Sequence, residues 1–175
     1  MKLFSENIED LRTLYVANLK KALDMEEKIS KALPKMIEKS TDPQLVTAFR
    51  NHLEETRGHV AKVEGLLRDA TGDASTSTCK AISALITEAE DNIKDAGDPS
   101  IRDIGLIASA QPVEHHEIAV YGTLRSWAEL LGNDEAAGTL ESILEEEKNA
   151  DEMLSTISDT VNTSAEKTSA FTTTV

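Results

Sequence analysis

Long periodic stretches alternate with short breaks along the chain. Within each stretch apolar residues recur three and four positions apart, which is the spacing of one face of an α-helix. Proline and glycine gather mostly in a few clusters between these stretches. The pattern predicts an all-α protein of five helices, at about residues 5–38, 43–71, 78–96, 100–131 and 134–161.

The breaks indicate how these helices are connected. Thr41, Asp42 and Pro43 form the pattern of a helix cap followed by proline in the first turn, and Ser100 is the expected cap of the fourth helix. The first link is very short, so the first two helices should be antiparallel neighbours. Four long helices and one short middle helix predict a four-helix bundle with a helical crossover between its two hairpins.

The sequence predicts one folded domain over residues 1–161. Residues 162–175 are rich in serine and threonine and lack a sustained apolar stripe, so we expect them to form a flexible tail.

Charge and cysteine content restrict the function classes. The formal net charge of −14 would repel phosphate backbones and anionic lipids, which disfavours nucleic-acid and membrane-surface roles. No apolar run approaches the roughly 20 residues that span a bilayer, and the N-terminal residues turn acidic where a signal peptide would be apolar. A single cysteine, Cys79, fits a reducing compartment. We therefore expect a cytoplasmic protein.

Carboxylates interrupt the apolar faces of the long helices. Glu26 lies close to the centre of the first apolar face, whereas Glu27 should point to solvent. In the fifth helix a gap of one turn in the apolar stripe is filled by Glu147 and Asp151. In the fourth helix, Glu114 and Glu117 share the inner face at i, i+3 spacing. On the second helix, one edge of the apolar face carries His52, Glu55 and His59.

An ionised carboxylate in a helix bundle interior is costly unless it is paired. Lysine and arginine are scarce on these inner faces, where Arg125 is the main candidate partner. Oxygen ligands with one or two imidazoles suit iron or manganese, and a glutamate from each helix with added histidine is the dinuclear carboxylate pattern. Each of these candidate ligands alone is common on a helix by chance. The prediction of a metal site therefore depends on their occurrence on all four long helices.

Three neighbouring side chains have less direct assignments. His116 should project away from the inner face, and His115 lies at its margin, where it is expected to support a ligand or cap a group. Tyr121 is one turn from Glu117 and is predicted either to be a core residue with a satisfied hydroxyl or to donate a hydrogen bond or an electron to an oxidised centre.

Several motifs together resemble the YciE/YciF-like family of bacterial stress proteins. They are HLEET at 52–56, EHHEIAVYGTL at 114–124, LEEEKNAD at 144–151, KALPKM at 31–36 and RDIGLIASAQ from Arg102, and the resemblance runs from about residue 10 to 160. It implies a ferritin-like fold related to rubrerythrins, a homodimer and a link to stress conditions. It also implies metal ligands at Glu26, Glu55, Glu114, Glu117 and Glu147.

The sequence departs from the ferritin-like pattern at two positions where histidine is usual. The residues three positions after Glu55 and Glu147 are Gly58 and Ala150. His59 and Asp151 are the expected substitutes, with His52 as an alternative nitrogen donor. Pro112, just before Glu114, should kink or bulge the fourth helix.

Two functions follow as hypotheses. The first is a dinuclear iron or manganese protein that reduces oxygen or peroxide or oxidises ferrous iron, with Glu55 and Glu117 bridging and Glu26, Glu114 and Glu147 terminal. The sequence points to no electron donor for it. The second is a structural or partner-binding stress protein that retains the fold without turnover.

Overall fold

The protein, described as a computed structural model over residues 8–171, consists of five α-helices joined by short connections. Its helices are α1 (Leu11–Lys39), α2 (Pro43–Thr71), α3 (Lys80–Asp95), α4 (Pro99–Leu130) and α5 (Asp134–Phe171).

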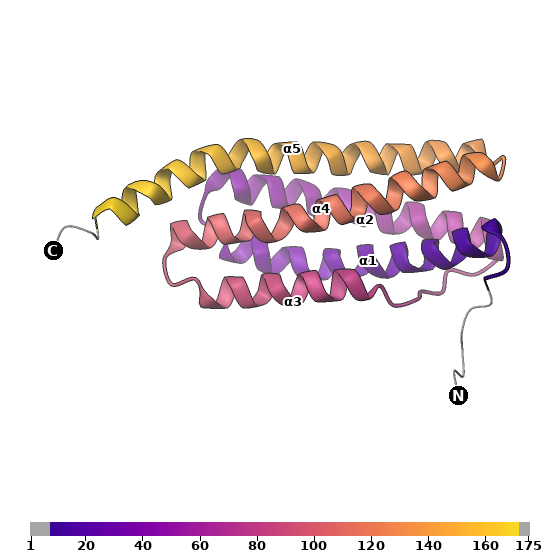
Figure 1. Cartoon of the computed structure of the whole chain (residues 1–175), viewed down its shortest axis with the longest axis horizontal. Coiled ribbons are helices and arrows are strands. Elements are labelled where there is room, and N and C mark those ends of the chain that lie inside the picture. Colours follow the sequence, from indigo (N-terminus) through magenta and orange to yellow (C-terminus); the bar gives the residue numbers. More distant parts are fainter. Residues whose placement is uncertain (1–7, 172–175) are drawn as a thin grey trace, which may run out of the picture.

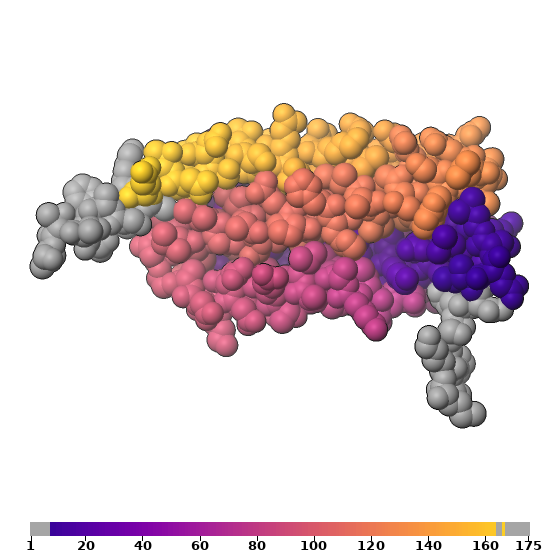
Figure 2. Space-filling model, in the orientation of Figure 1, coloured from indigo at the N-terminus to yellow at the C-terminus, as the bar shows by residue number. Residues whose placement is uncertain are grey.

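Four long helices lie side by side and form the bundle (Figure 1). Helices α1 and α5 run in one direction, and α2 and α4 run in the opposite direction. The shorter α3 packs on α1 and α4 and returns the chain along the length of the bundle between the two hairpins. The predicted four-helix bundle with a crossover helix is confirmed. The space-filling view shows α4 and α5 in contact along most of their length (Figure 2).

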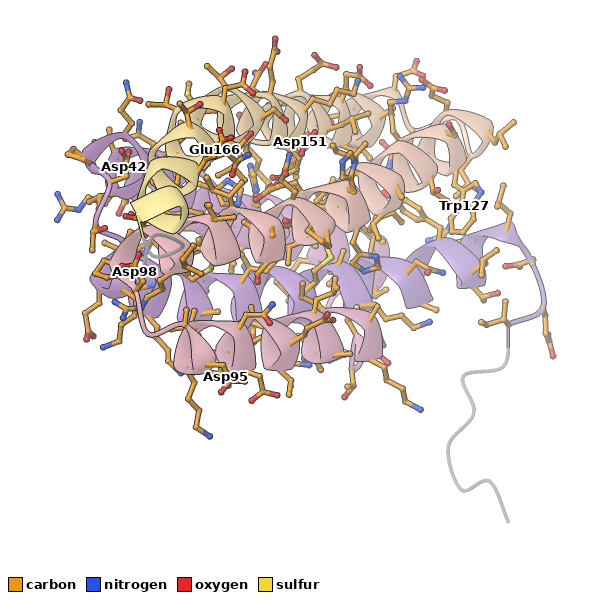
Figure 3. The ribbon with its side chains drawn as sticks, turned by 60° about the vertical axis from the view of Figure 1, so that its left-hand side comes forward. Asp42, Asp95, Asp98, Trp127, Asp151 and Glu166 are labelled. Atoms are coloured by element: carbon orange, nitrogen blue, oxygen red, sulfur yellow. The ribbon has the colours of Figure 1, made fainter. Side chains whose placement is uncertain are left out.

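Aspartates begin the two parallel helices α2 and α4. Asp42 accepts hydrogen bonds from the backbone N–H groups of residues 44 and 45, with proline at the first helical position, as predicted. The expectation of Ser100 as the cap of α4 is wrong, because Asp98 accepts from the backbone N–H of Ser100 itself at 2.8 Å. Asp42 and Asp98 lie at the same end of the molecule (Figure 3).

Three predicted helix features differ from the structure. Helix α1 begins at Leu11, because Asp10 and Thr13 form a reciprocal capping box there. Helix α5 continues to Phe171, ten residues past its expected end, so most of the predicted tail is helical. Residues 1–7 and 172–175 lie outside the described part. The backbone of α4 remains α-helical through Pro112, without the bulge that the sequence suggested.

The core is apolar along most of the bundle, and one buried polar contact ties its end together. Fully buried side chains come from every helix and include Leu19, Phe49, Ile82, Leu124 and Ile143. At the end where α1 passes into α2, the carboxylate of Asp103 on α4 is 3% exposed. It accepts from Thr41 N (2.8 Å), Thr41 Oγ1 (2.6 Å) and Asp42 N (2.8 Å). This carboxylate therefore fixes the α1–α2 turn against α4.

Among the described residues, none of the helices is both long and apolar enough to cross a membrane.

Candidate metal centre

Glu26 occupies a fully buried position on the inner face of α1. Its Oε1 accepts a hydrogen bond from the hydroxyl of Tyr121, which is also fully buried, on α4. Glu27 is partly exposed and pairs with Lys31 on the surface, as the helical spacing predicts. The sequence therefore separates the inner from the outer glutamate correctly.

Helix α2 contributes two histidines that are seven residues apart, which is about two helical turns, and both are buried. Glu55 lies between them in the sequence but faces another direction. Its side chain is 45% exposed, and its Oε2 lies 3.7 Å from Nδ1 of His52. The structure thus brings His52 and His59 into the interior and leaves Glu55 at the surface.

Helix α4 contributes Glu114 and Glu117, which are 3% and 0% exposed. Their i, i+3 spacing places them on one face, as predicted. His115 is 66% exposed and lies 3.6 Å from the Oδ1 of Asp151. His116 turns towards α3, where its Nε2 lies 3.7 Å from the Sγ of Cys79.

Helix α5 contributes Glu147, which is fully buried. Asp151, one turn later, is 21% exposed on the α4-facing side of α5 (Figure 3), where its Oδ1 accepts from Gln111 at 3.3 Å. The predicted partner of the buried carboxylates, Arg125, instead pairs with Glu141 at 2.7 Å.

Six of the predicted side chains meet in the middle of the bundle, and we call them the central cluster: Glu26, His52, His59, Glu114, Glu117 and Glu147. They form two groups, within each of which one ligand atom per residue lies within 4.8 Å of the others. One group is His52, Glu114, Glu117 and Glu147; the other is Glu26, His59 and Glu147. Only Glu147 belongs to both of these groups. Glu55 and Asp151 belong to neither, and their assignment as ligands stays a prediction.

Most of the polar atoms in this cluster have no hydrogen bond. Eleven buried side-chain nitrogen and oxygen atoms of the described residues lack a partner, and nine of them belong to the central cluster. They include both oxygens of Glu117, both oxygens of Glu147 and both ring nitrogens of His52. A buried polar atom without a partner is destabilising by about 1–3 kcal/mol, so this concentration of unpaired atoms points to a ligand that they would share.

Burial also changes the acidity of the carboxylates. Removal from water raises the pKa of Glu114 to about 8, and the charge of Glu147 adds to this shift. Burial also raises the pKa of Glu117 well above its usual range, and the charges of Glu147 and Glu26 raise it further. The pKa of Glu26 is raised mainly by burial. These carboxyl groups therefore favour protonation until a cation is present.

The pKa values of the two buried histidines are also raised, but by the neighbouring carboxylates and not by burial. Burial alone would lower the pKa of His52, but the carboxylates around it, led by Glu114, outweigh burial and raise that pKa to about 9. For His59, the carboxylates of Glu147 and Glu26, which lie 2.9 and 3.7 Å from Nδ1, likewise outweigh burial and raise the pKa to about 10. The central cluster thus retains protons that a metal ion would displace.

Glu146 is a member of the site that the sequence did not single out. Its Oε2 lies 2.5 Å from Nε2 of His59, and Lys62 donates to the same carboxylate at 3.1 Å. When Nε2 carries the proton of this hydrogen bond, Nδ1 faces Glu147 Oε1 at 2.9 Å and Glu26 Oε2 at 3.7 Å. A carboxylate that orients a histidine in this way is usual behind metal ligands. The only sequence signal was its position beside Glu147.

The donor set fits a hard or borderline transition metal. Four carboxylates and two imidazoles favour iron or manganese over ions that select thiolates. Two groups that share one carboxylate offer ligands for two ions. The inward-facing glutamates and histidines of four helices resemble the dinuclear carboxylate pattern, although α2 and α5 lack its Glu-x-x-His spacing.

Comparison with known proteins gives the same architecture. Residues 10–166 match the family model described as a domain of unknown function, DUF892. The chain is 35% identical to Protein YciF of Escherichia coli over 162 residues, which cover 91% of this chain and 98% of YciF. The crystal structure of that stress protein superposes with a TM-score of 0.84 over 89% of this chain and 98% of the other.

Two further structures are similar. YcfI of Rhodopseudomonas palustris, named as a candidate structural protein, is 38% identical with a TM-score of 0.84, over 88% of this chain and 98% of that one. A ferritin-like, diiron-carboxylate protein of Bacillus anthracis has a TM-score of 0.67 over 86% of this chain and 99% of the other. At 16% identity this likeness concerns the fold alone. With its ferritin-like bundle and the match over residues 10–166, the chain belongs to the DUF892 family.

Proposed function

We propose that the central cluster binds two iron or manganese ions and that the protein uses them in metal handling or in the defence against oxidants. The observation that supports this most directly is the set of nine unpaired polar atoms on six buried side chains. A core without a metal would be more stable with apolar residues at these positions.

The two groups of the central cluster suggest how the ions would be held. His52, Glu114 and Glu117 would hold one ion, and Glu26 and His59 would hold the other. Glu147 would bridge them, because it alone belongs to both groups. This differs from the sequence hypothesis, in which Glu55 and Glu117 bridge. When bound, such a pair supplies one-electron oxidation and reduction, which suits the reduction of oxygen or peroxide or the oxidation of ferrous iron.

The surrounding residues would hold the ligands of this site in position. Tyr121 donates to Glu26, and its ring meets the ring of His59 edge to face at 6.4 Å between centroids. Burial raises the pKa of Tyr121 well above 10, so its hydroxyl keeps its proton. We assign Tyr121 the role of holding Glu26 in place. Its hydroxyl also lies close enough to the central cluster to take part in catalysis.

The location and assembly of the protein belong to the same proposal. A cytoplasmic homodimer without nucleic-acid or membrane partners agrees with the acidic composition and with the family resemblance. Sedimentation equilibrium at several concentrations would test the dimer, and a monomer throughout would contradict it.

Metal content per chain tests the proposed function. Protein purified without chelators should contain close to two iron or manganese ions per chain by elemental analysis. Glu117→Ala should lose them, while Glu145→Ala, at an exposed position on α5, should keep them. Failure of the wild type to bind metal, even after anaerobic reconstitution, would contradict the proposal.

A second candidate is a structural stress protein without turnover. The outward position of Glu55, together with Gly58 and Ala150 where ferritin-like sites usually have histidine, favours it. The melting temperature separates the two, because a ligand of the native state stabilises it by linkage. A metal protein should melt at a higher temperature when loaded than in chelator, and a structural protein should melt at the same temperature in both.

A further inference from the structure

A groove between α2 and α5 connects the surface with the central cluster. It has a volume of about 560 Å³ and is lined by both polar and apolar side chains, the apolar ones including Phe49, Ala150 and Leu154. The titratable side chains of its lining are His52, Glu55, Glu114 and Glu146. The groove therefore opens directly on ligands of the proposed centre.

Three polar residues of the groove form a row of decreasing exposure. The side chain of Glu55 is 45% exposed, that of His52 is 6% and that of Glu114 is 3%. Glu55 Oε2 lies 3.7 Å from Nδ1 of His52, and Nε2 of His52 lies 3.5 Å from Oε1 of Glu114. Neither ring nitrogen of His52 makes a hydrogen bond. Ligand atoms thus follow one another from solvent to the buried centre.

The opposite side of His52 offers a much narrower space. A cavity of about 40 Å³ lies among α1, α3 and α4 and also reaches His52 and Glu114. Its volume is that of a few water molecules, and its lining includes Lys35 and Glu90, which form an ion pair at 3.1 Å. A hydrated divalent cation would find little room there.

A metal ion needs a route to a centre that is this deeply buried. Divalent cations carry tightly held water, which they lose stepwise as protein oxygen atoms replace it. A partly exposed carboxylate beside an unpaired imidazole provides the first of these replacements. Glu55 is partly exposed and lies beside such an imidazole. A role in binding the incoming ion therefore explains its outward position better than a place in the centre itself.

We propose that this groove is the route by which divalent cations reach the centre, and that Glu55 binds them first and transfers them to His52 and Glu114. The inference rests on the proposed function. It assigns Glu55 a transient contact with the incoming ion, in place of the permanent bridging role that the sequence suggested.

Rapid mixing of metal-free protein with cobalt(II), followed by the visible absorption of the bound ion, tests the role of Glu55. Glu55→Gln should slow loading by about tenfold, the lower end of electrostatic effects on association rates, and should leave the final number of ions per chain unchanged. Glu54→Gln is the matched control, because Glu54 is the neighbouring residue, is 70% exposed and contacts Arg57. It should load at the wild-type rate.

A second pair of variants tests the route without changing charge. Ala150→Leu narrows the groove, and Ala32→Leu fills space beside the small cavity on the opposite side. Cobalt should bind more slowly than in the wild type only in Ala150→Leu. Circular dichroism spectra and melting temperatures of the metal-free proteins would show that each variant is folded.

Three results would overturn the proposal, and they differ from one another. Fewer ions per chain in Glu55→Gln would make Glu55 a permanent ligand. Loading of Glu55→Gln and Ala150→Leu at the wild-type rate would place the route elsewhere. A wild type that binds no cobalt would remove the proposed function itself and this inference with it.

Discussion

Asp103 and Glu117 are buried carboxylates on the same helix, about four turns apart. Asp103 accepts three hydrogen bonds from the α1–α2 turn and fixes that turn against α4. Neither oxygen of Glu117 makes a hydrogen bond, and the charges that raise its pKa are those of other glutamates. Burial of a carboxylate is compatible with folding when its oxygens are satisfied, so the two residues require different explanations.

A buried carboxylate whose oxygens are satisfied is explained by the fold, whereas one whose oxygens are unsatisfied points to a ligand. The surroundings of Asp103 account for its presence without any further component. The central cluster has four carboxylates, and within the described part of the chain the ion-pair partners of Glu26, Glu114 and Glu147 are the histidines of the same cluster.

The largest expected effect is the response of the metal-free protein to pH. His52 and His59, whose pKa values are raised to about 9 and 10, and Glu114, raised to about 8, bind more protons in the native state than in the unfolded state. Stability should therefore fall as pH rises, by about 4 kcal/mol between pH 6 and 9 for one extra bound proton.

Urea unfolding in chelator at each pH measures this dependence. Saturating manganese should reverse the slope, because the ligands must lose protons to bind the ion. A metal-free protein whose stability rises with pH through this range would contradict the arrangement of the central cluster.

Asp103→Leu should destabilise the protein by about 3 kcal/mol, because it leaves three hydrogen-bond donors without their acceptor. Urea unfolding should show this loss equally with and without metal. A loss that appears only in the metal-loaded protein would mean that Asp103 belongs to the metal site.

Glu117→Leu should have the opposite sign in metal-free protein. Replacement of an unpaired buried carboxylate by an apolar side chain of similar volume should stabilise it by about 2 kcal/mol. The same unfolding experiment measures the gain, and the variant should no longer respond to manganese. If it is destabilised as strongly as Asp103→Leu, Glu117 has a structural role like that of Asp103.

Glu146→Gln should have the smallest effect on the fold, and a selective effect on metal. It weakens the hydrogen bond that orients His59, and such a change lowers metal affinity by about tenfold or more. Competition titration against a chelating dye measures the affinity. Glu145→Gln, one residue earlier and exposed, is the control and should bind as the wild type does. Equal affinities in the two variants would exclude this role for Glu146.

The sequence predicted the bundle and most of the buried cluster from helical periodicity. Glu26, Glu114, Glu117 and Glu147 lie near the centres of apolar faces, where a small rotation of a helix does not change burial. His52, Glu55 and His59 lie on the edge of the α2 face. Glu55 is about 40–60° around the helix from the two histidines, so the exact rotation of α2 decides which side chains enter the core.

Other features depend on contacts between helices and left little trace in the sequence. Glu146 follows Glu145 in an acidic run, and its role is visible only when His59 is placed beside it. Likewise, the choice of Glu147 as the shared residue depends on side-chain positions from four helices. The cap at Asp98 was missed because serine and aspartate are both good caps and lie two residues apart.

Anomalous diffraction from crystals of manganese-loaded protein is the most direct test of the difference between the two environments. We expect two peaks per chain within the central cluster, one beside His52, Glu114 and Glu117 and one beside Glu26 and His59, with Glu147 between them and no peak at Asp103. A central cluster without manganese in crystals grown at saturating metal would contradict this expectation.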